Sequence, residues 1–410
     1  MSFPAFYNFY GPGIFEYYNK RQSADCVAKA VVSHYVAVQA YTTMSTQAQK
    51  IPVGVLGATG TVGQRFILQL SEHPNFELVA LGASSSSAGK PYIDAVAGRW
   101  KQIQPVPANV RDIVVQECTV EAFRNCGVIF SGLDSGPAGP TEEAFRAANL
   151  RVFSNAKNYR MDPLCPLVVP LVNTEHLDII PHQRASLAPP IDKGFIVTNA
   201  NCSTTGVVVA LKALEKAFGP LNKVLVTTMQ AISGGGYPGV SSLDILDNVV
   251  PFISGEEGKI ESETLKILGS LNSDKTEYDN HASSPLSVSA QCNRMPVIDG
   301  HLASVSVSFA NQPPPSPAQV VDALRAYRCE AQDLACHSAP EFAITVHDEP
   351  DRPQPRLDRE WQNGAGVNVG RVRECPVLDI KFVSLVNNVM LGAATSSVLN
   401  AEVALKKGYL

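Results

Sequence analysis

Short apolar runs alternate with amphipathic segments along the chain from residue 51 onward. The first run, 51–56, has the composition of a buried parallel strand, and the segment after it carries Phe66, Ile67 and Leu70 at helical spacing. Strand-like and helix-like segments then continue in turn, over 76–83, 128–132, 141–148 and 151–154. This strand–helix–strand rhythm predicts an α/β fold with a doubly wound sheet.

The second half of the chain keeps regular patterning. A strand over 194–198 leads into an apolar helical pattern over 207–218. Further strands are expected over 223–229, 301–309 and 378–386, and further helices over 255–268 and 393–407. The polar, proline-rich segment 349–359 is expected to be irregular.

Composition narrows the class of protein. The 410 residues are 45% apolar with a formal net charge of −5, which allows two or three domains and argues against a nucleic-acid surface. No apolar stretch is long enough to span a bilayer, so no membrane partner is expected. The nine cysteines lack C-x-x-C spacing, which indicates reduced thiols in a cytoplasmic protein without a zinc site, and no metal is expected.

Residues 1–49 differ in character from the rest. They hold six of the twelve tyrosines but show no clear amphipathic period. We expect a disordered extension or a mis-assigned start, with Met44 as the alternative first residue. Mitochondrial targeting by residues 1–43 is the weaker interpretation, because few basic residues stand against Glu16 and Asp25.

A glycine-rich turn, GATGTVG at 57–63, joins the first strand to its helix. Glycines at this spacing permit a tight turn and a close approach to a pyrophosphate on the helix N-terminus. A dinucleotide is therefore expected to bind at Gly57, Thr59, Gly60, Thr61, Val62 and Gly63.

The strand over 76–83 ends in SSSSAGK at 84–90, with no acidic residue to bind a free ribose 2′-hydroxyl. Ser84, Ser87 and Lys90 favour the 2′-phosphate of NADP (NADPH) over NAD; the alternative is a flexible serine loop. The loop 155–161 follows another strand, where such sheets bind ligands. Its Arg160 is either an anion clamp or a surface arginine.

The segment NANCSTTG at 199–206 places Cys202 between a strand and a helix. A helix N-terminus presents free N–H groups and partial positive charge, which favour a thiolate and a developing oxyanion. Cys202 is therefore a candidate nucleophile. The alternative is an ordinary buried cysteine at a turn.

Other polar residues are candidates for the same chemistry. Gln230 opens a glycine-dense loop and could orient an acyl group. Glu256 and Lys259 share a helix face, although a solvated helix start has the same pattern. Arg294 and His301 flank a Pro- and Gly-containing turn, and histidine is the natural base for a cysteine. Nothing local in the sequence brings His301 to Cys202.

Together these motifs resemble aspartate-β-semialdehyde dehydrogenase, in its fungal and archaeal-like branch. The resemblance runs from residue 51 to the C-terminus. It rests on four motifs in order and on the seven-residue spacing of Arg294 and His301. The motifs are GATGTVG, NANCSTTG, GEEGK and CNRMPVIDGH.

The resemblance implies a Rossmann-type NADP-binding domain over 50–199, an α+β catalytic and dimerisation domain over 200–386, and a C-terminal helix, 387–410, that returns to the first domain. It implies NADPH-dependent reduction of L-4-aspartyl phosphate to L-aspartate 4-semialdehyde in threonine, methionine and lysine-type biosynthesis. A homodimer or a dimer of dimers is expected.

The resemblance also implies roles for single residues. Cys202 would form a thioester, His301 would act as acid/base and Gln230 would orient the acyl group. Substrate binding would fall to Arg294 for the α-carboxylate, Glu256 for the α-amino group, Lys259 with Arg160 for the phosphate, and Asn201 for support of the thioester site. Asn388 would lie near the nicotinamide.

Two positions depart from the family pattern. Ser86 stands where relatives often carry an arginine near the 2′-phosphate, and Thr395 replaces a glycine expected close to the cofactor. The alternatives are an N-acetyl-γ-glutamyl-phosphate reductase, whose cysteine is embedded differently, and a non-catalytic NADP-binding regulator.

Overall fold

The computed structural model describes residues 49–410. The predictions for the N-terminal extension, including Met44 as a start, lie outside the described residues.

A seven-stranded parallel sheet forms the first half of the described chain, in the order β3-β2-β1-β4-β5-β7-β6. Its strands are β1 Ile51–Leu56, β2 Phe76–Ala83, β3 Gln116–Glu117, β4 Val128–Ser131, β5 Arg151–Ser154, β6 Leu167–Val168 and β7 Phe195–Asn199. The central strands are almost wholly buried, as the apolar runs predicted. The strand order reverses between β1 and β4, and in such sheets ligands bind at this point, outside the carboxyl ends of the strands.

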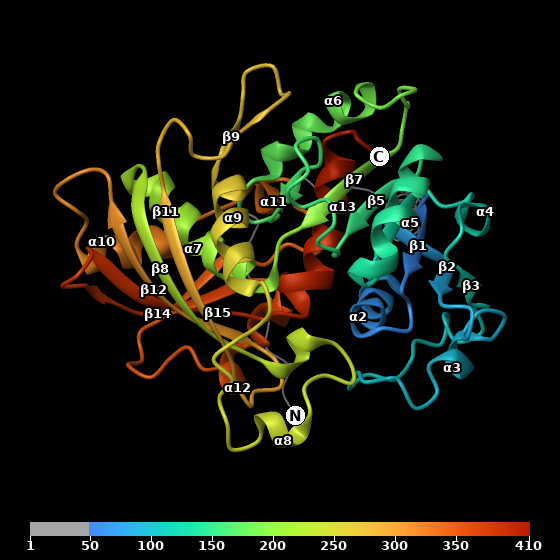
Figure 1. The fold of residues 1–410 in the computed structure, drawn as a ribbon, viewed down its shortest axis with the longest axis horizontal. Helices are drawn as coiled ribbons and strands as arrows, with labels where there is room; N and C mark the ends of the chain where they lie inside the picture. Colours follow the sequence, from blue (N-terminus) through green and yellow to red (C-terminus); the bar gives the residue numbers. More distant parts are fainter. Residues whose placement is uncertain (1–48) are drawn as a thin grey trace, which may run out of the picture. The chain divides into compact units, whose positions relative to one another are not determined.

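A six-stranded mixed sheet follows, in the order β11-β8-β12-β15-β14-β13. Its strands are β8 Leu221–Gln230, β11 Ser287–Arg294, β12 His301–Phe309, β13 Ile344–His347, β14 Val367–Glu374 and β15 Ile380–Val386. A small antiparallel pair joins β9 Ser270–Leu271 to β10 Tyr278–Asp279. Figure 1 shows the parallel sheet in blue and green and the strands of the mixed sheet in yellow-green to red. The α/β fold class is confirmed.

The helices cover these sheets. The α-helices are α2 Thr61–Leu70, α3 Tyr92–Ala95, α4 Val120–Phe123, α5 Ser135–Ala147, α6 Ile180–Ala185, α7 Cys202–Phe218, α8 Ser242–Ile245, α9 Glu256–Leu268, α10 Pro317–Ala326, α11 Glu330–Asp333, α12 Pro355–Asp358 and α13 Thr395–Lys406. Shorter turns are η1 Thr174–Ile179, η2 Ile232–Gly235, η3 Trp361–Gly364 and the π-helical η4 Met390–Ala394.

The helices differ from expectation at three places. α7 begins at Cys202 rather than at residue 207, because the Asn201 side chain caps it. α5 begins at Ser135, since Pro137 falls in its first turn, where no N–H donor is needed. The segment 349–359 is not wholly irregular, because α12 lies within it and begins with Pro355.

The C-terminal helix α13 contacts α2, β4, β5 and β7, so it lies against the parallel sheet (Figure 1). The chain reaches this position through η4, which is separated from the end of β15 by a short turn. The domain limits expected at 199/200 and 386/387 stay a prediction.

Helix α7 packs on the mixed sheet at very close range. A Cβ atom added at Gly206 would lie 2.6 Å from Cγ1 and 2.9 Å from Cβ of Val386 in β15. Only glycine therefore fits between this helix turn and the strand that leads to η4.

We expect Gly206→Ala to lower the free energy of unfolding by about 1–3 kcal/mol, because overpacking a β-branched neighbour outweighs the gain in helix propensity. Urea titration measures the effect. Gly258→Ala in α9 is the matched control, since its Cβ would meet open space. Equal urea midpoints for the two variants would contradict the packing argument.

Candidate active site

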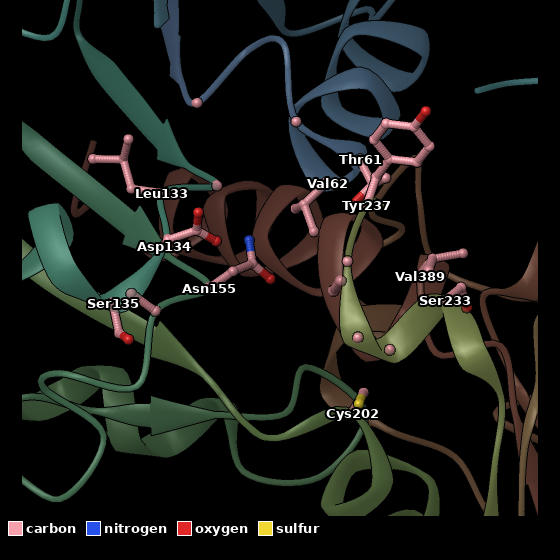
Figure 2. Close-up of a pocket in the computed structure, with 18 of the residues that line it drawn as sticks. Thr61, Val62, Leu133, Asp134, Ser135, Asn155, Cys202, Ser233, Tyr237 and Val389 are labelled. Atoms are coloured by element: carbon pink, nitrogen blue, oxygen red, sulfur yellow. The ribbon is translucent and has the colours of Figure 1, made fainter. Parts of the chain in front are cut away.

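A cavity of about 1020 Å³ lies at the carboxyl ends of β1 and β4 and extends to the start of α7. Figure 2 shows Thr61 and Val62 on one side of this cavity, Leu133, Asp134 and Ser135 on another, and Cys202 below the 233–237 loop. The glycine turn, the cysteine and the glycine-dense loop, distant in sequence, thus share one cavity.

The glycine turn has the backbone that a dinucleotide requires. Gly57 has φ +72°, and a Cβ there would lie 2.7 Å from the Gly132 carbonyl oxygen. A Cβ at Gly63 would lie 2.1 Å from the Gly57 carbonyl oxygen. α2 begins after Gly60, whose missing side chain leaves the first helical N–H groups uncapped. These donors at a cavity wall fit a bound pyrophosphate.

Most predicted cofactor residues line this cavity, but three do not. Those lining it are Gly57, Thr59, Gly60, Thr61, Val62, Ser84 and Asn388. Gly63 packs beneath the turn, and Ser87 is buried away from the cavity. Exposed Lys90 donates to the Ser86 carbonyl oxygen at 2.8 Å, which holds the serine loop closed on itself.

Thr395 does not lie at the cavity wall, contrary to expectation. It lines a second cavity of about 430 Å³ together with Met390, His73 and Gln69, and its hydroxyl accepts a hydrogen bond from Gln69 at 2.9 Å. Its backbone is ordinary right-handed helix, with φ −61° and ψ −37°, so threonine fits there without strain.

Cys202 is the first residue of α7, and Asn201 is its N-cap. The Asn201 Oδ1 accepts the N–H groups of Ser203 at 2.9 Å and Thr204 at 3.1 Å. The expectation of free N–H groups is therefore wrong for these two donors. Stabilisation of a thiolate at this helix end is therefore left to the helix dipole and to the neighbouring cationic side chains.

Burial of the Cys202 thiol raises its pKa to about 12. The nearby Glu256 carboxylate raises the pKa further, whereas the positive charges of Arg160, Arg294 and Lys259 lower it. In the ligand-free protein the thiol is consequently protonated at neutral pH.

The carboxyl end of β8 brings Gln230, Arg294 and His301 together. Arg294 pairs with Gln230 across β11 and β8, and Leu302, next to His301, pairs with Met229 across β12 and β8. The Arg294 Nη1 donates to the Ala231 carbonyl oxygen at 2.7 Å. A Cβ on Gly234 would lie 3.0 Å from Arg294 Nη1 and 3.1 Å from His301 Nε2, so the glycine-dense loop closes over both side chains.

His301 is a neutral imidazole, because burial and the adjacent Arg294 lower its pKa to about 3. Its Nδ1 accepts the Ala231 N–H at 3.1 Å. The neutral ring therefore carries its proton on Nε2. This nitrogen is buried and has no hydrogen-bond partner among residues 49–410.

Helix α9 supplies the remaining predicted residues. Lys259 Nζ donates to Glu256 Oε2 at 2.8 Å, and the Asn201 amide donates to Glu256 Oε1 at 2.8 Å. Burial alone would raise the pKa of Glu256, but these hydrogen bonds hold it below its ordinary value. Arg160 lines the cavity beside them.

Predicted Asn388 links two loops of the site. Its Oδ1 accepts the Gly300 N–H at 2.8 Å, and its Nδ2 donates to the Ser233 hydroxyl at 2.9 Å. The sequence reasoning missed the cavity-lining Asp134, Ser135, Val389 and Gly392, and it included Asn155 and Tyr237 only as members of loops, without a role. Asp134 and Ser135 lie three and four residues after the end of β4, so the strand-end rule applied to the loop 155–161 could also have found them.

Two family models match the chain. Semialdehyde dehydrogenase, NAD binding domain, matches residues 52–180, and semialdehyde dehydrogenase, dimerisation domain, matches residues 211–391. The aspartate-semialdehyde dehydrogenase of Cryptococcus neoformans is 65% identical over 88% of this chain and 98% of its own length. The chain belongs to the aspartate-semialdehyde dehydrogenase family.

Two further members of the aspartate-semialdehyde dehydrogenase family are also similar to this chain over most of its length. The Schizosaccharomyces pombe enzyme is 58% identical over 87% of this chain and 99% of its own. The crystal structure of the Candida albicans enzyme with NADP has a TM-score of 0.82 and 53% identity, and the match covers 88% of this chain and all of that one. The resemblance read from the motifs is confirmed.

We expect alkylation of Cys202 by iodoacetamide to accelerate about tenfold per pH unit between pH 7 and 10 without a plateau, because only the thiolate reacts. Peptide mass spectrometry follows each cysteine separately. Cys375 is the internal reference: burial raises its pKa, but the N–H groups of Leu378 and Val377 outweigh this and leave the pKa lowered. A plateau at Cys202 with a midpoint below pH 8 would contradict the assignment.

Proposed function

We propose that Cys202 is the nucleophile of this oxidoreductase, which reduces L-4-aspartyl phosphate to L-aspartate 4-semialdehyde and belongs to threonine, methionine and lysine-type amino-acid biosynthesis. The observation that carries the proposal is the position of this thiol. It opens a helix inside the same cavity as the glycine turn, with Arg160, Lys259 and Arg294 near enough to lower its pKa.

In the first half-reaction the Cys202 sulfur attacks the acyl carbon, a carbon–sulfur bond forms and the carbon–oxygen bond to phosphate breaks. The thiol proton ends on the departing phosphate, which leaves as hydrogen phosphate. The product on the protein is a thioester. Covalent catalysis in this form separates phosphate departure from reduction.

NADP is the cofactor, and in its reduced form it supplies hydride when bound at the Gly57–Gly63 turn. The protein's part in this half-reaction is to stabilise the oxygen of the resulting thiohemiacetal and to release the aldehyde with the thiol restored. We assign to His301 a hydrogen bond from its Nε2–H to this oxygen, since its Nδ1 accepts the Ala231 N–H. The neutral ring has a single proton, so the proton that restores the thiol comes from solvent, and the acid and base roles expected of His301 would require a proton on Nδ1 as well or instead.

The substrate groups are assigned by charge. Arg294 suits the α-carboxylate because a planar guanidinium can donate two parallel hydrogen bonds. Glu256, ionised through its contacts with Lys259 and Asn201, suits the α-ammonium group. Lys259 and Arg160 remain for the phosphate, and Gln230, at the end of β8, for the acyl oxygen.

We propose a homodimer whose interface is the face of the mixed sheet that α7 does not cover. α7 covers one face of β8, β12 and β15, while Leu225, Thr227, Gln291 and Ser304 are exposed on the other. The matched dimerisation model spans these strands. A dimer of dimers is the larger form that this proposal allows.

None of the helices within residues 49–410 is long and apolar enough to cross a membrane. A cytoplasmic location is part of the proposal, supported by the eight free cysteines of the described chain.

We expect Leu225→Arg to convert the dimer into a monomer, because a desolvated guanidinium at a two-fold interface repels its copy. Sedimentation velocity gives the mass. Ile103→Arg, on a fully exposed apolar residue of the other half, should leave the mass unchanged. A dimeric Leu225→Arg protein would contradict this face as the interface.

We expect Cys202→Ala to abolish turnover and to leave NADPH affinity within about twofold, because the thiol contributes chemistry rather than cofactor binding. Turnover is followed as NADPH formation from aspartate semialdehyde, phosphate and NADP, and affinity by fluorescence titration. An active alanine variant would refute the nucleophile.

The same assay tests the reaction itself. N-acetylglutamate semialdehyde replaces aspartate semialdehyde in a parallel series with the wild-type protein. Turnover of the acetylated aldehyde alone would favour the reductase alternative, and turnover of neither would favour the regulator.

A further inference from the structure

One face of α9 carries four charged residues in the order Glu256, Lys259, Glu263, Lys266. Their spacing of three, four and three residues places all four on one side of a helix. Glu256, Glu263 and Lys266 are each less than 5% exposed. The first two members face the cavity, and the last two lie deeper, outside its lining.

Glu263 bridges two parts of the site. Its Oε1 accepts a hydrogen bond from Arg160 Nη1 at 2.9 Å, and its Oε2 accepts the backbone N–H of Asn201 at 2.6 Å. Arg160 is the proposed anion clamp, and Asn201 directly precedes the thiol. One buried carboxylate therefore sets where the cation and the nucleophile lie relative to each other.

The guanidinium of Arg160 is held on two sides. Besides the contact with Glu263, its Nη2 donates to the Asn155 carbonyl oxygen at 2.9 Å. The side chain is 11% exposed, so it has little freedom to reorient. An ion pair buried this deeply is costly to break, because removing one charge leaves the other desolvated.

Lys266 fixes the backbone beneath this guanidinium. Its Nζ donates to the carbonyl oxygens of Arg160, Asp162 and Cys165 at 2.9, 2.7 and 2.9 Å. The loop that carries Arg160 is therefore anchored to α9 through its backbone, and the Arg160 side chain through Glu263. Both anchors come from the same helix that carries Glu256 and Lys259.

We propose that Glu263 is a positioning residue that holds the Arg160 guanidinium at the phosphate subsite while it fixes the junction bearing Cys202. The proposal rests on the phosphate role given to Arg160 above. Glu263 acts through Arg160 and does not itself touch substrate.

The test is Glu263→Gln, assayed as NADPH formation with inorganic phosphate, aspartate semialdehyde and NADP. The amide has the same shape but accepts at one oxygen only, so one of the two contacts is lost. We expect the KM for phosphate to rise at least about fivefold and the KM for aspartate semialdehyde to change less than about twofold.

Glu261→Gln is the matched control. Glu261 lies on the same helix and accepts the Ala290 N–H at 3.0 Å, away from the cavity. Its KM for phosphate should stay at the wild-type value. A rise equal to that of Glu263→Gln would overturn the proposal.

Arg160→Ala completes a double-mutant cycle. We expect it to raise the KM for phosphate, and we expect Glu263→Gln to add nothing to this rise in the Arg160→Ala background. Additive effects would reduce Glu263 to a structural residue and overturn the proposal. If Arg160→Ala raises the KM for phosphate but Glu263→Gln leaves it unchanged, the positioning role of Glu263 is overturned. The proposed function then stands.

An unchanged KM for phosphate in Arg160→Ala would remove the phosphate role itself and the inference with it. Thermal unfolding and NADPH affinity report whether each variant folds. Should Glu263→Gln not fold, Glu263→Asp replaces it. This variant keeps the charge but is too short to reach both donors, and a selective rise in the KM for phosphate is again expected.

Discussion

The site depends on how one buried strand-to-helix junction satisfies its polar groups. Asn201 caps α7 with its Oδ1, donates its amide to Glu256 and donates its backbone N–H to Glu263. Asn201, Glu256 and Glu263 are each no more than 5% exposed, so losing one of these bonds would leave a buried polar group unpaired. The cost of breaking them holds the two helices α7 and α9 in one relative position.

Burial also sets the resting state of the chemistry. The thiol and the imidazole are both neutral in the ligand-free protein, since desolvation outweighs the charges around them. The cations beside Cys202 are already in place, and their effect grows in a medium of low dielectric constant. Within residues 49–410, Cys202 and His301 therefore form no permanent thiolate–imidazolium pair in the ligand-free protein.

Much of this arrangement could be predicted from the sequence. β2, β5 and β12 begin and end where the apolar patterns placed them, because each strand is bounded by turn residues. The glycine turn and Cys202 share a cavity, as the motifs implied. Local signals of this kind depend only on neighbouring residues.

Contacts between distant segments could not be predicted in the same way. Glu263 lies 103 residues from Arg160, and Thr395 faces a second cavity that no local pattern indicates. The proton position on His301 depends on the Ala231 N–H, 70 residues away in the chain. The α9 charge pattern was visible in the sequence, but only the fold shows which of its members reach the cavity.

The π-helical segment η4 separates the two cavities. Val389, Gly392 and Ala393 line the larger one, whereas Met390 lines the smaller, so neighbouring side chains face opposite ways. A Cβ on Gly392 would lie 2.9 Å from the Cβ of Cys202. The partition is thus a single turn of backbone in contact with the thiol-bearing residue. A substitution that displaces this turn of backbone would therefore change the shape of both cavities and move the thiol-bearing residue at the same time.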